Sequence, residues 1–125
     1  MKRIIFVVVT FLLLAGMGSV GYAGAAETKT LKIGHLVALT EWFSVFDILQ
    51  DRETKMVAEM INEAGGINIK GKRYNIELVT ADFKSTLDGS AAGANKLVYD
   101  EKVKFVVGPF GFFSSASSPI FEANK

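Results

Sequence analysis

The stretch FDILQDRETKMVAEMINEAGG, residues 46–66, decides the fold, because its apolar side chains recur at the spacing of an amphipathic helix. The apolar stripe consists of Leu49, Met56, Val57, Met60, Ile61 and Ala64. The other side carries Asp51, Arg52, Lys55, Glu59 and Glu63. We interpret these charges as a solvated face rather than a metal site, with Asp51 and Lys55 spaced for an ion pair one turn apart. The pattern predicts a helix with one apolar and one charged face.

Signals at both ends of this helix fix its extent. Ser44 or Asp47 could cap its start, and Gly65-Gly66 could end it in the left-handed conformation. Apolar segments with strand-forming residues flank it, LKIGHLVAL at 31–39 and NIELVTAD at 75–82. Strand, helix and strand in this order predict two parallel strands joined by a right-handed crossover. The polar stretch between Gly66 and the second strand is expected to be a loop or a short hairpin.

The second half of the chain repeats the alternation. A weaker helix is expected from about Thr86 to Asp100, with Ser85 as its N-cap. Its Gly89 and Gly93 would allow the helix to approach the sheet closely. VKFVVG, residues 103–108, predicts a third strand, and a third helix is expected to begin near Ser114. The order β-α-β-α-β-α predicts the α/β class with a doubly wound parallel sheet. Three strands leave a bare edge and a small core, so we interpret the chain as part of a longer protein.

The first 26 residues have the features of an export signal. Lys2-Arg3 precede an apolar run, and Ala23-Gly24-Ala25 form a small-residue cleavage site, with Ala26 also possible. This predicts a cleaved signal peptide over residues 1–26, forming a helix, and localisation in the periplasm; an uncleaved membrane anchor is the alternative. The glycine pattern GMGSVG, residues 16–21, lies inside this segment and opens no helix of a βαβ unit. We therefore do not interpret it as a dinucleotide site.

Charge and composition exclude several classes of function. The chain of 125 residues has 14 basic and 13 acidic side chains and no cysteine. Without Lys2 and Arg3, 12 basic residues face 13 acidic ones, a net charge of −1. This gives no electrostatic footprint for nucleic acid. No pattern of metal ligands or phosphate-binding glycine loop follows residue 26, so no cofactor and no metal are expected.

An enzymatic role is not supported by the residues. His35 is the single histidine and lies inside the first strand, where we interpret it as structural rather than catalytic. An exported hydrolase would need a nucleophile with a nearby base at a loop, and His35 is not placed there. Asp82 ends the second strand and could either face a cleft or cap the following turn.

The loops after the three strands carry the candidate site. Ligands of open α/β sheets bind beyond the carboxyl ends of the strands. The loops there read TEWFSVFD, DFKST and GPFGFFSSAS, and the first and third combine aromatic with hydroxyl side chains. Such a mixture is typical of small-molecule sites. Ser114 or Ser115 could bind an anionic group at the start of the third helix. Alternatively, Ser114 only caps that helix, and Phe110, Phe112 and Phe113 pack under a neighbouring lobe.

Several segments taken in order resemble one family. LKIGHLVALT, MINEAGGINIKGKRYNIELVTAD, NKLVYDEKVKFVVGP and SPIFEANK are similar to the periplasmic branched-chain amino acid binding proteins, the type I substrate-binding proteins of ABC importers. The resemblance covers nearly all of residues 31–125. It implies two α/β lobes closing on a ligand that is delivered to a membrane permease. Residues 27–125 would then be the N-terminal, flavodoxin-like part of lobe one, which alone would bind ligand weakly or not at all. The full-length protein would be a monomer.

The resemblance also implies site residues. The family's ligand-contacting aromatic after the first strand falls on Phe46, with Trp42 close by, and its serine loop follows the third strand. Here Gly111 and Phe112 stand where the family has serines, which return only at 114 and 115. The extra phenylalanines favour a bulkier ligand than leucine, an aromatic acid or amide. The predicted ligand-binding residues are Trp42, Phe46, Phe110, Phe112, Ser114 and Ser115. The ligand-sensing ectodomain of a signalling receptor, which uses the same lobes, is the alternative function.

Overall fold

The computed structural model describes residues 28–124. The predicted signal peptide over residues 1–26, including its helix, lies outside the described residues. Between residues 28 and 124, no helix combines the length and the apolar character needed to cross a membrane.

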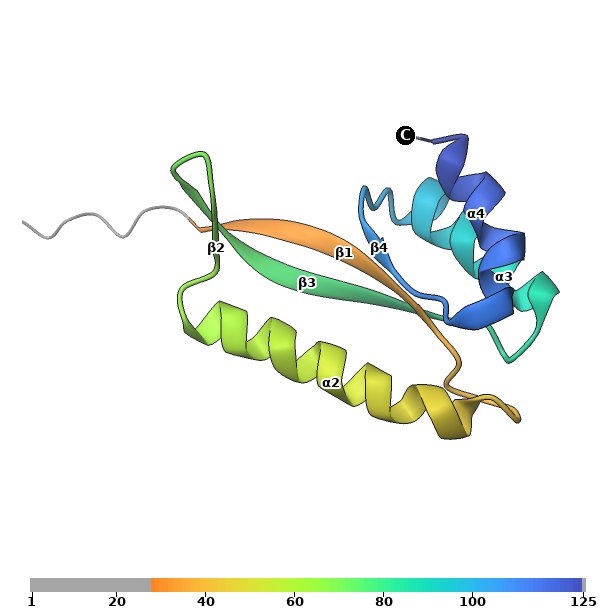
Figure 1. Ribbon diagram of the computed structural model, residues 1–125. Coiled ribbons are helices and arrows are strands. Elements are labelled where there is room, and N and C mark those ends of the chain that lie inside the picture. The colour runs from red at the N-terminus through yellow and green to blue at the C-terminus, as the bar shows by residue number, and fades with distance from the viewer. Residues whose placement is uncertain (1–27, 125) are drawn as a thin grey trace, which may run out of the picture.

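A mixed sheet with mainly parallel strands forms the centre of the fold (Figure 1). Its strand order is β2 (Ile67–Ile69), β3 (Lys72–Asp82), β1 (Lys29–Val37) and β4 (Val106–Val107), and the long central strands β1 and β3 are parallel. The helix α2 (Ser44–Glu63) lies along one face of the sheet, and α3 (Leu87–Asn95) and α4 (Ser114–Glu122) lie together on the other side (Figure 1). The predicted α/β class with a doubly wound sheet is therefore confirmed.

Two strands differ from the sequence-based prediction. The polar stretch after α2, predicted to be a loop or a short hairpin, forms a hairpin. Its strand β2 (Ile67–Ile69) pairs antiparallel with the start of β3. The third predicted strand shortens to β4 (Val106–Val107), which pairs with Gly34 and His35 of β1. Lys102 adopts a left-handed backbone with φ of 56°, and residues 103–105 after it are not part of a strand.

The helix α2 (Ser44–Glu63) ends where the sequence predicts and begins differently. Gly65 and Gly66 have φ values of 89° and 76°, which confirms the left-handed stop. The predicted caps are wrong, because no side chain caps the first turn. Ser44 Oγ donates to the carbonyl of Glu41 at 2.6 Å, and the Asp47 carboxylate accepts from Ala38 N–H at 2.8 Å.

The face of α2 that packs on the sheet is not the predicted one. The buried residues of the helix are Asp47, Asp51 and Ala58. Half or more of the surface of Leu49, Met56, Val57 and Met60 is exposed. The carboxylates can be buried because each has a partner: Ala38 N–H for Asp47, and Lys55 for Asp51 at 2.7 Å. The predicted Asp51–Lys55 pair is confirmed, but Asp51 does not lie on a solvated face.

The buried Asp51 faces His35 of β1. His35 is 1% exposed, and its Nδ1 lies 3.5 Å from Asp51 Oδ1. Burial lowers the pKa of His35, and this effect outweighs the opposite influence of the Asp51 carboxylate. The interior position and neutral imidazole agree with the structural interpretation of this histidine.

We expect the free energy of unfolding to decrease as the pH falls below about 6.5, the ordinary pKa of histidine. The pKa of His35 is lower in the folded chain than in the unfolded chain, so its contribution is present above the unfolded pKa and is lost below it. One proton gives a slope of at most about 1.4 kcal/mol per pH unit. Urea unfolding of the protein and of His35→Leu between pH 8 and 5 measures this. An equal slope in the variant would contradict the assignment to His35.

The helix α3 (Leu87–Asn95) continues into a π-helical turn at Lys96–Asp100, so the predicted helical stretch is confirmed with a wider last turn. Its N-cap is Thr86, whose Oγ1 accepts from Gly89 N–H at 2.9 Å. The prediction of Ser85 as the cap is wrong, because the Ser85 hydroxyl bonds to a different loop. A Cβ on Gly93 would lie 2.5 Å from the Leu36 side chain, which confirms the close approach of this helix to the sheet.

The hydrophobic core lies between the sheet and the α3–α4 pair and extends to the carboxyl ends of the strands. A 3₁₀ turn at Gly111–Phe113 leads into α4 (Ser114–Glu122). The buried cluster consists of Leu36, Ala38, Phe43, Ala81, Phe83, Ala94, Leu97, Val103 and Phe113.

Candidate functional site

The loops after β1, β3 and β4 meet at one edge of the sheet. The β1–β3 register places Val37 beside Asp82, so both strands end together, and Phe83 N–H donates to the carbonyl of Val37 at 3.1 Å. The first loop reaches the third through the Phe43 ring, which stacks on Phe110 at a centroid distance of 5.8 Å. The loops predicted to carry the site are therefore neighbours in the fold.

An aromatic cluster covers this edge. Phe43 and Phe113 are buried and contact each other edge-to-face at 5.0 Å. Around them stand four rings that are each about 60% exposed: Trp42, Phe46, Phe110 and Phe112. Phe46 packs on Phe43 at 5.2 Å, and Phe112 stacks on Phe113 at 4.2 Å. The buried rings support an exposed apolar surface that is available for ligand contact.

The structure thus brings together the four predicted aromatic side chains. Sequence reasoning missed Phe43, and it placed Phe113 only in the alternative of simple packing. Phe113 does pack in the core, but under the rim of its own lobe. The signal that could have found Phe43 is its position between two predicted aromatic site residues in one short loop.

The two predicted serines stand beside these rings at the start of α4. Ser114 Oγ donates to the Gly111 carbonyl at 2.8 Å, and Ser115 Oγ donates to the Phe112 carbonyl at 2.7 Å. Neither caps the helix, since no side chain accepts from its first turn, so the alternative interpretation of Ser114 as a cap is wrong. With their protons engaged, both hydroxyl oxygens keep lone pairs that can accept a hydrogen bond.

Asp82 connects the first and second loops. One carboxylate oxygen accepts from Leu39 N–H at 3.0 Å and from Lys84 N–H at 2.8 Å, and the other accepts from Thr40 Oγ1 at 2.7 Å. Burial alone would raise the pKa of Asp82, but these hydrogen bonds outweigh it and lower the pKa. Asp82 was predicted either to face a cleft or to cap the turn that follows β3, and its bond to Lys84 N–H favours the role as a cap of that turn.

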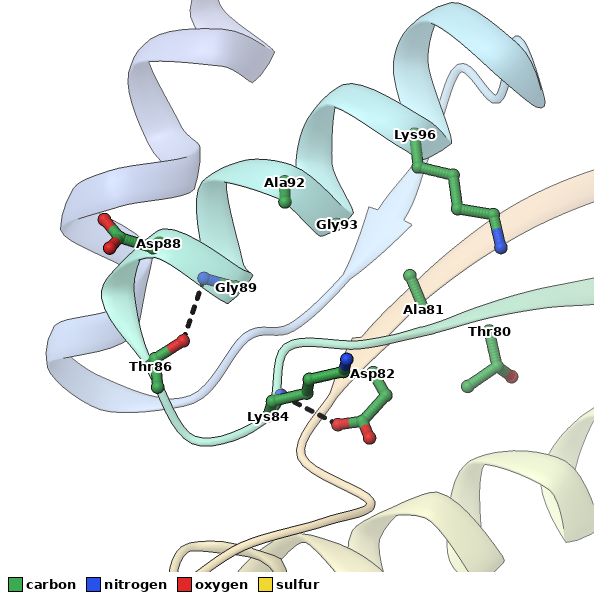
Figure 2. A pocket seen from close by; sticks show the side chains of 10 residues that line it. All are labelled: Thr80, Ala81, Asp82, Lys84, Thr86, Asp88, Gly89, Ala92, Gly93 and Lys96. Atoms are coloured by element: carbon green, nitrogen blue, oxygen red, sulfur yellow. Dashed lines mark hydrogen bonds between the residues drawn. The ribbon is translucent and has the colours of Figure 1, made fainter.

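A separate hollow lies between the end of β3 and α3 (Figure 2). Its volume is about 490 Å³, and Lys84 and Lys96 extend their side chains around it (Figure 2). None of the six predicted site residues lines it. In the described part of the chain, no cluster of three or more carboxylate or imidazole groups could hold a metal ion. The aromatic cluster, which gathers predicted site residues from the first and third loops, is the candidate site that we consider further.

Residues 30–125 match the periplasmic binding protein family. The chain belongs to this family. The resemblance found in the sequence is confirmed, and the members of this family are extracytoplasmic binding proteins.

Solved structures of transporter binding proteins have the same fold. The branched-chain amino acid transporter substrate-binding protein LivJ of Streptococcus pneumoniae, in complex with isoleucine, is 32% identical, with a TM-score of 0.62 over 77% of this chain and 26% of its own. The leucine-binding protein LivK of Thermotoga maritima is 26% identical, with a TM-score of 0.59 over 75% and 25%. A solute-binding protein of Rhodopseudomonas palustris in complex with 3,4-dihydroxybenzoic acid is 22% identical, with a TM-score of 0.55 over 73% and 24%. The chain spans about a quarter of the length of these proteins.

Proposed function

We propose that this chain is part of the extracytoplasmic solute-binding component of an ABC importer. The single observation that carries the proposal is the set of exposed rings from the first and third loops, gathered at the carboxyl edge of the sheet. In open α/β sheets this edge is where small ligands bind. The membrane partner is then a permease that receives the solute.

The proposed ligand is an amino acid, an amide or an aromatic acid. LivJ is seen with isoleucine and the Rhodopseudomonas palustris protein with 3,4-dihydroxybenzoic acid, so the same fold takes both chemistries. Flat exposed rings such as Trp42 and Phe112 favour a ligand with an aromatic group, which can stack on them. The free lone pairs of Ser114 and Ser115 could accept an N–H of an amide or amine.

The proposed domain organisation follows the family. Residues 1–26 would direct export and be removed, and residues 27–125 would form the first part of lobe one. N-terminal sequencing of the exported protein tests the cleavage, with Gly24, Ala26 or Glu27 expected as the first residue.

Calorimetry with L-leucine, L-isoleucine, 3,4-dihydroxybenzoate and benzamide tests the ligand class in the purified full-length protein that contains this chain, because residues 27–125 alone are expected to bind weakly or not at all. We expect an aromatic compound to bind more tightly than leucine. Leucine as the tightest of the four ligands would overturn the preference, and binding of none of them would overturn the proposed function for these ligand classes.

Phe112→Ala is expected to weaken binding of the best of these ligands about tenfold, because a stacking ring is lost. Its exposed position means that stability should change little. Phe105→Ala is the matched control. Phe105 is equally exposed but precedes β4, and within residues 28–124 its ring contacts none of the rings of the aromatic cluster. Equal losses in the two variants would place the ligand elsewhere.

A further inference from the structure

The first loop, residues 38–43, is held by side chains of the second loop. Ser85 is buried, its Oγ accepts from Phe43 N–H at 3.0 Å, and its hydroxyl donates to the Thr40 carbonyl at 2.8 Å. Asp82 holds the start of the same loop through Leu39 N–H and Thr40 Oγ1. Residues 39, 40 and 43 are thus fixed from another strand end more than forty positions along the chain.

The backbone of both loops is in a conformation that needs such support. Glu41, Lys84 and Ser85 have φ values of 66°, 51° and 53°, in the left-handed region that residues other than glycine rarely adopt. Such conformations persist where surrounding contacts hold them, and they gather at binding sites. The Asp82 carboxylate accepts from Lys84 N–H, as the dashed line in Figure 2 marks, so the second loop is braced at the residue before Ser85.

Phe43 links the hydrogen bonds of the first loop to the aromatic cluster. Its N–H is bound by Ser85, while its ring contacts Trp42, Phe46, Phe110 and Phe113 at centroid distances between 5.0 and 5.8 Å. A shift of Phe43 therefore changes the support of three of the four exposed rings.

We propose that Ser85, braced by Asp82, is a positioning residue for the aromatic site: it fixes the first loop so that Trp42 and the Phe43-supported rings form one surface. Ser85 itself is buried and is not proposed to touch ligand. Its consequence for ligand affinity rests on the proposed function, whereas its effect on the first loop does not.

The test uses Ser85→Ala and Ser85→Gly in the purified protein. Alanine removes both hydrogen bonds and keeps the strained backbone, whereas glycine removes them and adopts the same φ without strain. The loop is followed through the near-ultraviolet circular dichroism of Trp42, taken as the difference between each protein and its counterpart with Trp42→Phe. We expect this Trp42 signal to weaken in both variants. Affinity for isoleucine or 3,4-dihydroxybenzoate, whichever binds the parent, should fall about tenfold.

Asn62→Ala is the matched control. The Asn62 amide also makes one accepting and one donating hydrogen bond to backbone, with Ile76 N–H at 2.7 Å and its carbonyl at 2.8 Å, but near the opposite end of β3. It should lower stability without changing the Trp42 signal. An unchanged Trp42 signal in Ser85→Gly, or an equal loss in Asn62→Ala, would overturn the positioning role. If neither ligand binds the full-length protein, the proposed function fails for these ligands, while the Trp42 measurement still decides the inference.

Discussion

Replacing Gly66 by alanine is expected to lower the free energy of unfolding by about 2 to 5 kcal/mol, through backbone strain and overpacking together. Gly66 has a φ of 76°, and a Cβ built on it would lie 2.4 Å from the carbonyl oxygen of Tyr74. Tyr74 cannot easily move away, because it pairs with Ile67 of β2 and with Lys29 of β1. The clash would therefore separate the end of α2 from the hairpin that follows it.

Gly65→Ala is the matched control for this substitution. Gly65 has a similar φ of 89°, but a Cβ there meets no atom within 4 Å. The control should lose only the cost of the left-handed backbone, about 1 to 2 kcal/mol. Urea unfolding of the two variants and the parent measures the difference. Equal losses would mean that contact with Tyr74 has no part in the effect.

These glycines illustrate what could be predicted from the sequence. Gly65-Gly66 signals a helix end locally, because glycine adopts a left-handed φ without the steric cost that other residues have. The order of apolar and amphipathic segments likewise predicted the parallel sheet and the crossover helices. Both signals lie within short segments of the chain, so they can be recognised in a single sequence.

Features that depend on distant partners were not predictable in the same way. Asp51 belongs to a charged stripe in the sequence, yet it is buried where α2 packs beside His35 of β1. Ser85 has the local pattern of an N-cap, but its hydroxyl bonds to Thr40 and Phe43 instead. In each case a tertiary contact decides between roles that the residue type allows equally.

In the candidate site, too, some features could be predicted from the sequence and others could not. The position of the exposed rings followed from the rule that loops at the carboxyl ends of parallel strands meet. Which rings are buried beneath them did not, because Phe112 and Phe113 are adjacent and identical in type. Only the packing of the 3₁₀ turn directs one ring outward and the other into the core.

Phe113→Ala is expected to lower the free energy of unfolding by about 3 to 5 kcal/mol, the usual range for a buried phenylalanine. Phe113 is 1% exposed and its ring lies 4.6 Å from Phe83 and 5.0 Å from Phe43. Its removal leaves a cavity where the loops after all three parallel strands meet. The exposed rings that rest on it should then lose their fixed arrangement, so ligand affinity should fall as well.

Phe112→Ala separates the two roles of this pair. The same ring is removed one residue away, but from the exposed surface, so stability should fall by less than about 1 kcal/mol while affinity still decreases. Urea unfolding and calorimetry on both variants measure the contribution of each ring to the free energy of unfolding and to ligand affinity. Loss of stability in Phe112→Ala as large as in Phe113→Ala would mean that both rings belong to the core. The exposed aromatic surface would then have no independent part in holding a ligand.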